Sequence, residues 1–197
     1  MSEKQRCPWA IYAGGDTPIY IDYHDNEWGR PVHDDYKLFE MLILEGAQAG
    51  LSWITVLKKR EAYRATFDNF DPHKVALYDE LKVGQLMKNA GIIRNRLKIN
   101  AAITNAKLFL EIAQKHGSFS NFIWNYVNNT PIIGHWNRIE DVPTTTPLSD
   151  KISKDLKKMG FKFVGSTIIY SFMQAVGMVN DHLSSCFVYE ELKGGAL

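Results

Sequence analysis

The stretch "RNRLKINAAITNAKLFLEIAQKHG" (94–117) decides the fold class, because it predicts one long helix. Gly117 follows the last helical position, where a glycine commonly ends a helix. Upstream, "DPHKVALYDE" (71–80) opens with Asp71 as an N-cap and Pro72 at the first helical position. The middle of the chain is therefore predicted to be helical.

Four more segments predict helices: "DYKLFEMLILEGAQAG" (35–50), "FSNFIWNYVNN" (119–129), "TPLSDKISKDLKKMG" (146–160) and "STIIYSFMQAVG" (166–177). The first has apolar residues at helical spacing, namely Leu38, Phe39, Leu42 and Ala49. The last is apolar almost all round, which is typical of a central buried helix. No convincing alternating pattern predicts a strand. The fold class is therefore predicted to be all-α, with about eight helices.

Composition limits the possible classes of protein. A chain of 197 residues with 45% hydrophobic residues is the size of one globular domain, or of two lobes that share a core. No apolar run approaches the ~20 residues of a membrane span, and the polar start "MSEKQRCPW" does not resemble a signal peptide. We therefore expect a cytoplasmic protein with no membrane partner. The net charge of +1 gives no global sign of nucleic-acid binding, so such a function would need a local patch.

The segment "VNDHLSSC" (179–186) contains one of only two cysteines in the chain. If this segment is helical, His182 and Cys186 lie one turn apart on the same face and could bind one ion. A structural zinc site needs four such ligands, and Cys7 and His24 near the chain start would complete a Cys2His2 set. The alternative is an incidental thiol, a surface histidine and a chance spacing, and spacing alone favours this alternative.

A second candidate site lies in "LEGAQAGLSWITVLKKR" (44–60), where Glu45 sits in an apolar stretch. Burying an acid is costly unless the acid has a partner or a chemical task. Gly50, Leu51 and Trp53 follow near a predicted helix end. The alternative is that Glu45 faces solvent while Trp53 belongs to the core, and the pattern alone does not decide between these readings.

A third candidate is the turn in "LMKNAGIIRNRLKI" (86–99), where two helical patterns meet at Gly91 and the basic residues Arg94, Arg96 and Lys98 follow. Backbone N–H groups at the start of a helix can bind phosphate without sequence preference. The more common alternative is an ordinary helix corner with solvated basic side chains.

Four blocks together resemble the 3-methyladenine DNA glycosylase I family. They are "YIDYHDNEWG", "LFEMLILEGAQAGLSWITVLKKRE", "NAGIIRNRLKINAAITNA" and "GFKFVGSTIIYSFMQAVGMVNDH", and the likeness runs in order from about Cys7 to Cys186. The resemblance implies a two-lobed helix-hairpin-helix DNA glycosylase fold. One lobe would comprise residues 1–70 and 161–197, and residues 71–160 would form the other, which carries the hairpin.

The resemblance also implies one structural zinc ion that joins the N- and C-terminal segments, with Cys7, His24, His182 and Cys186 as its ligands. Four protein donors saturate tetrahedral zinc and leave no position for a reacting water. The catalytic site is therefore expected elsewhere in the chain.

The base pocket is likewise implied by the resemblance. Glu45 corresponds to the acid that recognises the damaged base, Tyr23 and Trp53 to aromatic pocket residues, and Trp9 and Tyr20 to neighbouring walls. A 3-methyladenine in DNA is cationic, so an anionic carboxylate and electron-rich rings suit it.

The DNA contacts follow from the same resemblance. Leu51, after Gly50, matches a wedge that fills the space left by the flipped base, and the turn with Gly91, Arg94 and Arg96 matches the phosphate-binding hairpin. The expected partner is double-stranded DNA that contains 3-methyladenine, and the expected oligomeric state is a monomer.

The hairpin reads "NAGIIRNR", and no Asp is evident where many helix-hairpin-helix glycosylases have a catalytic one, so the group that activates water is unassigned. No Lys occupies an obvious nucleophile position. The resemblance thus implies a base-excision-repair hydrolase, and the missing Lys implies that it has no lyase activity. Two alternatives are a non-catalytic DNA-damage-binding module of the same fold and a zinc hydrolase that uses Glu45 as its base.

Overall fold

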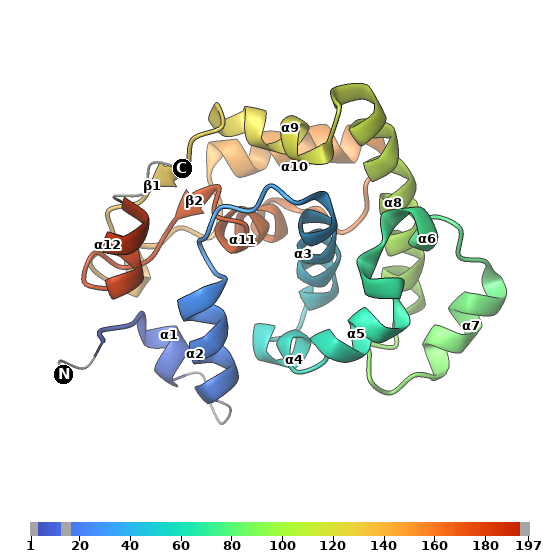
Figure 1. Cartoon of the computed structure of the whole chain (residues 1–197), viewed down its shortest axis with the longest axis horizontal. Coiled ribbons are helices and arrows are strands. Elements are labelled where there is room, and N and C mark those ends of the chain that lie inside the picture. Colours follow the sequence, from blue (N-terminus) through green and yellow to red (C-terminus); the bar gives the residue numbers. More distant parts are fainter. Residues whose placement is uncertain (1–3, 13–16, 194–197) are drawn as a thin grey trace.

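The computed structural model of the protein describes residues 4–12 and 17–193, and this part of the chain is mostly helical (Figure 1). The α-helices are α1 (Pro8–Tyr12), α2 (Thr17–Asn26), α3 (Asp35–Gln48), α4 (Trp53–Leu57), α5 (Arg60–Thr66), α6 (Pro72–Val75), α7 (Glu80–Lys88), α8 (Arg96–His116), α9 (Phe119–Trp124), α10 (Pro147–Met159), α11 (Ser166–Ala175) and α12 (Phe187–Lys193). Short 3-10 turns are η1 (Asp68–Phe70), η2 (Asn125–Val127) and η3 (Ile139–Asp141). Strands β1 (Ile132–Ile133) and β2 (Val179–Asn180) pair in parallel.

The caps expected from the sequence are present at the longer helices. Helix α8 starts after Asn95, whose side chain accepts from the Lys98 amide, and it ends at Gly117 with a φ of +83°. Helix α10 starts at a reciprocal capping box between Thr146 and Ser149 and ends at Gly160. The side chain of Asp71 caps α6 by accepting from the His73 amide. These elements confirm the prediction of a mostly helical fold.

The expected count of about eight helices is too low, because the described residues hold twelve α-helices. The extra ones are short segments such as α1 and α4, which offer too few residues for an apolar periodicity to stand out. The predicted helix at 71–80 stops at Val75, and α7 starts anew at the N-cap Asp79. The β1–β2 pair was not expected, since two residues per strand cannot show an alternating pattern.

Helices α3 and α11 lie in the middle of the molecule, with α6 to α8 on one side and α1, α2 and α12 on the other (Figure 1). Helix α11 packs against α10 and α3, and its residues Ile169, Phe172 and Met173 are fully buried, as its apolar pattern predicted. The N-terminal segment joins α12 through the Phe187 amide, which donates to the Gln5 carbonyl at 3.0 Å. The start of the described chain therefore lies beside the start of α12.

A buried ion network joins α2, α3 and α5. Arg60, only 4% exposed, donates to Glu40 at 2.7 Å and to Glu27, just after α2, at 2.8 Å. Burial alone would raise the pKa of Glu27, but hydrogen bonds from Arg60 and Lys37 lower it to about 2. Because α2 carries Tyr23 and α3 carries Glu45, this network fixes the two helices that hold the candidate pocket residues.

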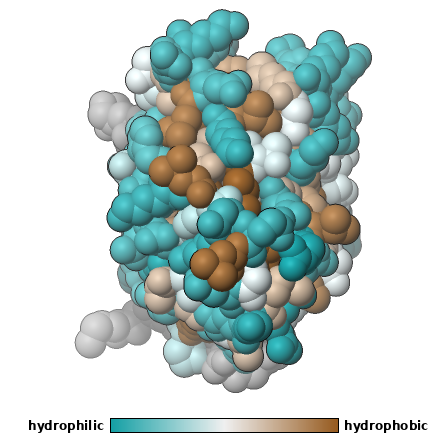
Figure 2. Space-filling view, turned by 90° about the vertical axis from the view of Figure 1, so that its right-hand side faces the viewer, coloured by the Kyte–Doolittle hydropathy of each residue, from teal (hydrophilic) through white to brown (hydrophobic). Residues whose placement is uncertain are grey.

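The face that includes α6, α7 and the start of α8 is largely hydrophilic, with small apolar groups between the polar side chains (Figure 2). Leu77, Leu81 and Leu97 are the exposed large apolar residues of this region. No helix within the described ranges is long and apolar enough to span a membrane.

Candidate functional site

The structure brings Cys7, His24, His182 and Cys186 into one buried cluster. Their donor atoms all lie within 4.8 Å of one another. The Cys186 Sγ lies 3.5 Å from His24 Nε2 and 3.6 Å from His182 Nδ1, and the Cys7 Sγ lies 3.6 Å from the same His182 Nδ1. The cluster has the right residue types to hold a metal ion.

The suggestion that His182 and Cys186 lie on one face of a helix is wrong, because both residues lie in a turn between β2 and α12. The Cys186 amide closes this turn by donating to the Leu183 carbonyl at 2.8 Å. The Leu183 amide in turn donates to the Cys7 Sγ at 3.4 Å. The two side chains converge through this turn and not through one face of a helix.

Hydrogen bonds outside the cluster orient both imidazoles. The Nδ1 of His24 lies 2.7 Å from the Asp25 carboxylate, which also accepts from Arg6 at 2.8 Å. The Nε2 of His182 lies 3.0 Å from the Trp28 carbonyl oxygen. Each ring thus keeps its other nitrogen toward the cysteines, which is the usual arrangement around metal-binding histidines.

Gly29 allows the His182 ring to pack this closely. It has a φ of +79°, and a Cβ there would lie 2.9 Å from the His182 Nε2. Any larger residue would be strained by its backbone angle and would displace the imidazole.

A second site is a cavity of about 280 Å³ beside α2, α3 and α11. All five residues expected in the base pocket line it, namely Trp9, Tyr20, Tyr23, Glu45 and Trp53. The Tyr23 and Trp53 rings lie 5.5 Å apart, and the Trp9 and Tyr20 rings 5.6 Å apart in an edge-to-face arrangement. A planar ring could stack in such an aromatic cavity.

Glu45 is the buried acid of this cavity. Its side chain is 4% exposed, and its Oε2 has no hydrogen-bond partner among the described residues. Burial raises the pKa of Glu45 to about 8, so in the empty cavity at neutral pH the protonated form is favoured over the carboxylate. The Trp53 Nε1 also lacks a partner within the described chain. Buried polar atoms without partners in a cavity indicate a place for a polar ligand.

The opposite wall contains polar residues that the sequence analysis did not identify. Asp181 accepts hydrogen bonds from Tyr170 at 2.5 Å, Trp136 at 2.7 Å and Gln174 at 2.9 Å. Two of these donors, Tyr170 and Gln174, lie one turn apart on α11, and the third, Trp136, comes from the segment after β1. Trp28 and Gln48 also line the cavity.

The expected DNA-contact residues lie outside the cavity lining. Gly50 follows α3 with a φ of +78°, and no atom lies within 4 Å of the place where its Cβ would be. Leu51, directly after it, is 42% exposed. The Gly50–Leu51 turn is therefore an apolar projection on the helix that also carries Glu45.

Gly91 and Arg94 lie in the hairpin between α7 and α8, and Arg96 is the first residue of α8. A Cβ on Gly91 would lie 2.8 Å from the Ala62 Cβ, so a larger residue would push the hairpin away from α5. Arg94 is exposed, whereas Arg96 forms an exposed ion pair with Glu80 at 2.7 Å.

Solved structures of 3-methyladenine DNA glycosylase I are similar to this structure. One crystal structure of a 3-methyladenine DNA glycosylase I is 55% identical, has a TM-score of 0.88, and aligns over 93% of this chain and 98% of that one. A second, from Staphylococcus aureus, concerns recognition of 3-methyladenine; it is 40% identical over 91% of this chain and 95% of that one, with a TM-score of 0.87.

The sequence comparisons agree with the structural ones. The chain is 55% identical to the DNA-3-methyladenine glycosylase 1 of Escherichia coli strain K12, over 94% of this chain and 97% of that protein. A model of the methyladenine glycosylase family matches residues 13–189. The chain belongs to the methyladenine glycosylase family.

Proposed function

We propose that the protein is a DNA repair enzyme that excises 3-methyladenine by hydrolysing the bond between the base and the deoxyribose, which leaves an abasic site. The observation that carries this proposal is the cavity itself, in which an unpartnered buried acid, Glu45, faces aromatic rings. The similarity to the glycosylases named above supports the substrate.

The chemistry of the lesion fits these groups. A 3-methyladenine in DNA carries a positive charge, which aromatic faces attract with about 0.5–2 kcal/mol. A cation beside Glu45 would favour its ionised form and oppose the effect of burial. The carboxylate would then accept hydrogen bonds from the adenine amine, with Tyr23 and Trp53 against the ring. Base binding would thus be coupled to loss of a proton from Glu45.

The reaction needs little acid catalysis. When the bond to C1′ breaks, its electron pair stays with the base, which leaves as a neutral molecule. Water adds to C1′ and gives up one proton. The protein acts as a monofunctional hydrolase without lyase activity, so the site must bind the flipped base, orient it and admit one water.

The lesion reaches the cavity only after leaving the duplex, which costs a few kcal/mol. Leu51 fills the vacated space, and the open surroundings of Gly50 leave room for the strand. The hairpin binds phosphates downstream through the amides that start α8 and through Arg94. Arg96 can contact a phosphate only after its ion pair with Glu80 breaks, which costs little because an exposed ion pair is weak.

The Cys/His cluster holds one structural zinc ion in this proposal. For Zn–S and Zn–N bonds of about 2.3 and 2.0–2.1 Å, tetrahedral geometry places sulfur and nitrogen about 3.6 Å apart. The three sulfur–nitrogen distances given above for Cys7 and Cys186 are 3.5, 3.6 and 3.6 Å. Zinc would join the N-terminal segment to the turn before α12. The lobe of residues 1–70 and 161–197 carries the Cys/His cluster and the five expected base-pocket residues, and the lobe of residues 71–160 carries the hairpin and adds Ile139 and Val142 to the pocket lining.

The test is formation of abasic sites in methylated duplex DNA by the purified protein, with Glu45→Gln as the matched variant. Alkali-induced strand breaks should accumulate with the parent and form more slowly with the variant. A parent that binds methylated DNA but produces no abasic sites would be a damage-binding module instead. We expect the enzyme to act as a monomer in the cytoplasm on double-stranded DNA.

A further inference from the structure

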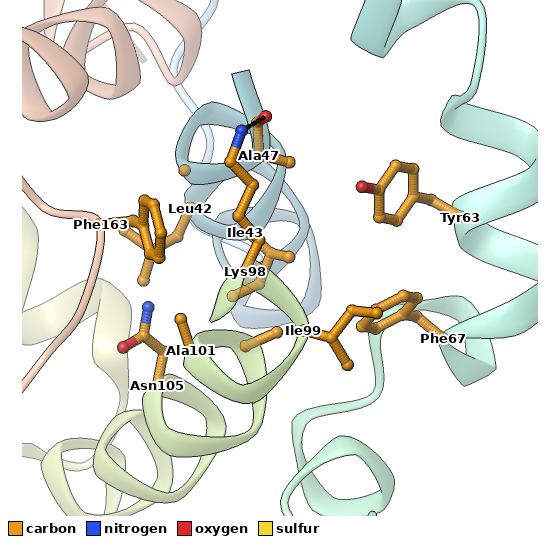
Figure 3. A pocket seen from close by; sticks show the side chains of 12 residues that line it. Leu42, Ile43, Ala47, Tyr63, Phe67, Lys98, Ile99, Ala101, Asn105 and Phe163 are labelled. Atoms are coloured by element: carbon orange, nitrogen blue, oxygen red, sulfur yellow. Dashed lines mark hydrogen bonds between the residues drawn. The ribbon is translucent and has the colours of Figure 1, made fainter. Parts of the chain in front are cut away.

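Lys98 lies beside a small cavity of about 20 Å³ between α3, α5 and α8 (Figure 3). Its side chain leaves the first turn of α8 and extends toward the end of α3, where its ammonium group meets the Ala47 carbonyl (Figure 3). The Lys98 Nζ donates to the Ala47 oxygen at 2.8 Å and to the Ala49 oxygen at 2.7 Å. One side chain therefore joins two helices that carry different parts of the proposed DNA site.

The last carbonyls of α3 need partners from outside the helix. The Gly46 oxygen accepts from the Ala49 amide at 3.4 Å, and the Gln48 oxygen accepts from the Leu51 amide at 2.6 Å. Among the described residues no backbone amide outside the helix donates to the Ala47 or Ala49 oxygen, and Lys98 supplies both hydrogen bonds. A cation here also complements the negative end of the helix dipole.

The position of Lys98 in α8 relates it to the hairpin. Its backbone amide donates to the Asn95 side chain at 3.1 Å, which is the N-cap bond that ends the hairpin and starts α8. Its side chain meets the carbonyls on both sides of Gln48, directly before the Gly50–Leu51 turn. Lys98 therefore connects the start of α8, directly after the hairpin, to the end of α3 beside the Gly50–Leu51 turn, in addition to the hydrogen bonds that join the hairpin to Lys59 and Tyr63.

We propose that Lys98 is a positioning residue for base extrusion, which holds the Gly50–Leu51 turn in register with the phosphate-binding hairpin. The proposal rests on the proposed function. The ammonium group of Lys98 holds the end of α3 in place. Leu51 would therefore enter a DNA duplex bound at the hairpin always at the same position. A purely structural role would instead affect stability and every activity alike.

The test compares Lys98→Met, which keeps the aliphatic stem, with Lys98→Arg, which can still donate to both carbonyls. Lys154→Met on the exposed face of α10 is the control for loss of one positive charge. Excision is measured in single turnovers at saturating enzyme, on duplex and on single-stranded methylated DNA. Extrusion is measured separately by the fluorescence of 2-aminopurine placed beside the lesion.

Lys98→Met should slow excision from the duplex by about tenfold or more, as expected for the loss of charge-assisted hydrogen bonds. It should lower the 2-aminopurine signal and leave excision from single strands unchanged, because a single-stranded base needs little extrusion. Lys98→Arg should recover most of both signals, and Lys154→Met should match the parent.

Equal losses on duplex and single-stranded DNA, or an unchanged 2-aminopurine signal, would overturn the positioning role. If the parent excises no base, the proposed function fails. The fluorescence comparison would then still decide the role of Lys98 at the wedge.

Discussion

Replacing Glu45 by glutamine should stabilise the folded protein, and the gain should grow with pH. Burial raises the pKa of this carboxyl from 4.5 to about 8. Because the folded-state pKa lies above the unfolded-state value, the contribution of Glu45 to the free energy of unfolding is fully present below pH 4.5. This contribution is lost as the pH rises through 8.

The magnitude follows from linkage. Between pH 5 and pH 7 the unfolded chain has released the Glu45 proton while the folded protein mostly retains it. Each pH unit in that range costs the folded state about 1.4 kcal/mol, with smaller slopes near both ends. The integrated loss between pH 5 and pH 7 is about 2.5 kcal/mol. Glutamine has no such titration, so the parent alone should lose this stability.

The assay is urea-induced unfolding of the parent and Glu45→Gln at several pH values between 5 and 8, in matched metal and salt. The difference in the free energy of unfolding between the two proteins cancels every other titrating group. It should increase by about 2.5 kcal/mol in favour of the variant from pH 5 to pH 7. A difference that stays constant over this range would refute the buried, protonated state of Glu45.

Three other predictions concern the Cys/His cluster, the proposed wedge residue Leu51 and the hairpin. Cys186→Ser should lose zinc and lower the free energy of unfolding, by less than the ~10–16 kcal/mol that zinc supplies in finger peptides, and elemental analysis that finds no zinc in the parent would contradict this. Leu51→Ala should slow single-turnover excision from duplex DNA about tenfold at unchanged stability, and equal rates would remove the wedge role. Arg94→Gln should weaken binding of all DNA sequences alike and reduce the salt slope by about one, whereas an unchanged slope would show that Arg94 meets no phosphate.

Local signals explain which helices the sequence could predict. Helix α10 has a capping residue, a first-turn proline and a terminal glycine, all of which act within a few residues. Helix α4 has no side-chain cap and spans only Trp53–Leu57, so packing determines it. The break between α6 and α7 was missed because no Gly or Pro marks it and Asp79 caps a new helix instead.

The candidate sites, like the helices, were predicted only in part from the sequence. Residue types and the family resemblance predicted the members of the Cys/His cluster, but the helical reason offered for His182 and Cys186 was wrong. The anionic state assumed for Glu45 depended on burial, which only the packed structure reveals. Asp181 was missed because its contacts with two residues of α11 and with Trp136, 45 positions away in the sequence, form only when the chain folds.

The central claim is selective excision of 3-methyladenine, and chromatography of the bases released from methylated duplex DNA tests it most directly. A carboxylate at Glu45 can accept from the adenine amine, whereas guanine presents an acceptor oxygen at the corresponding position. The parent should therefore release free 3-methyladenine and little 7-methylguanine, although both lesions are cationic, and Glu45→Gln should release 3-methyladenine more slowly. Efficient release of 7-methylguanine, or no release of 3-methyladenine, would contradict the account.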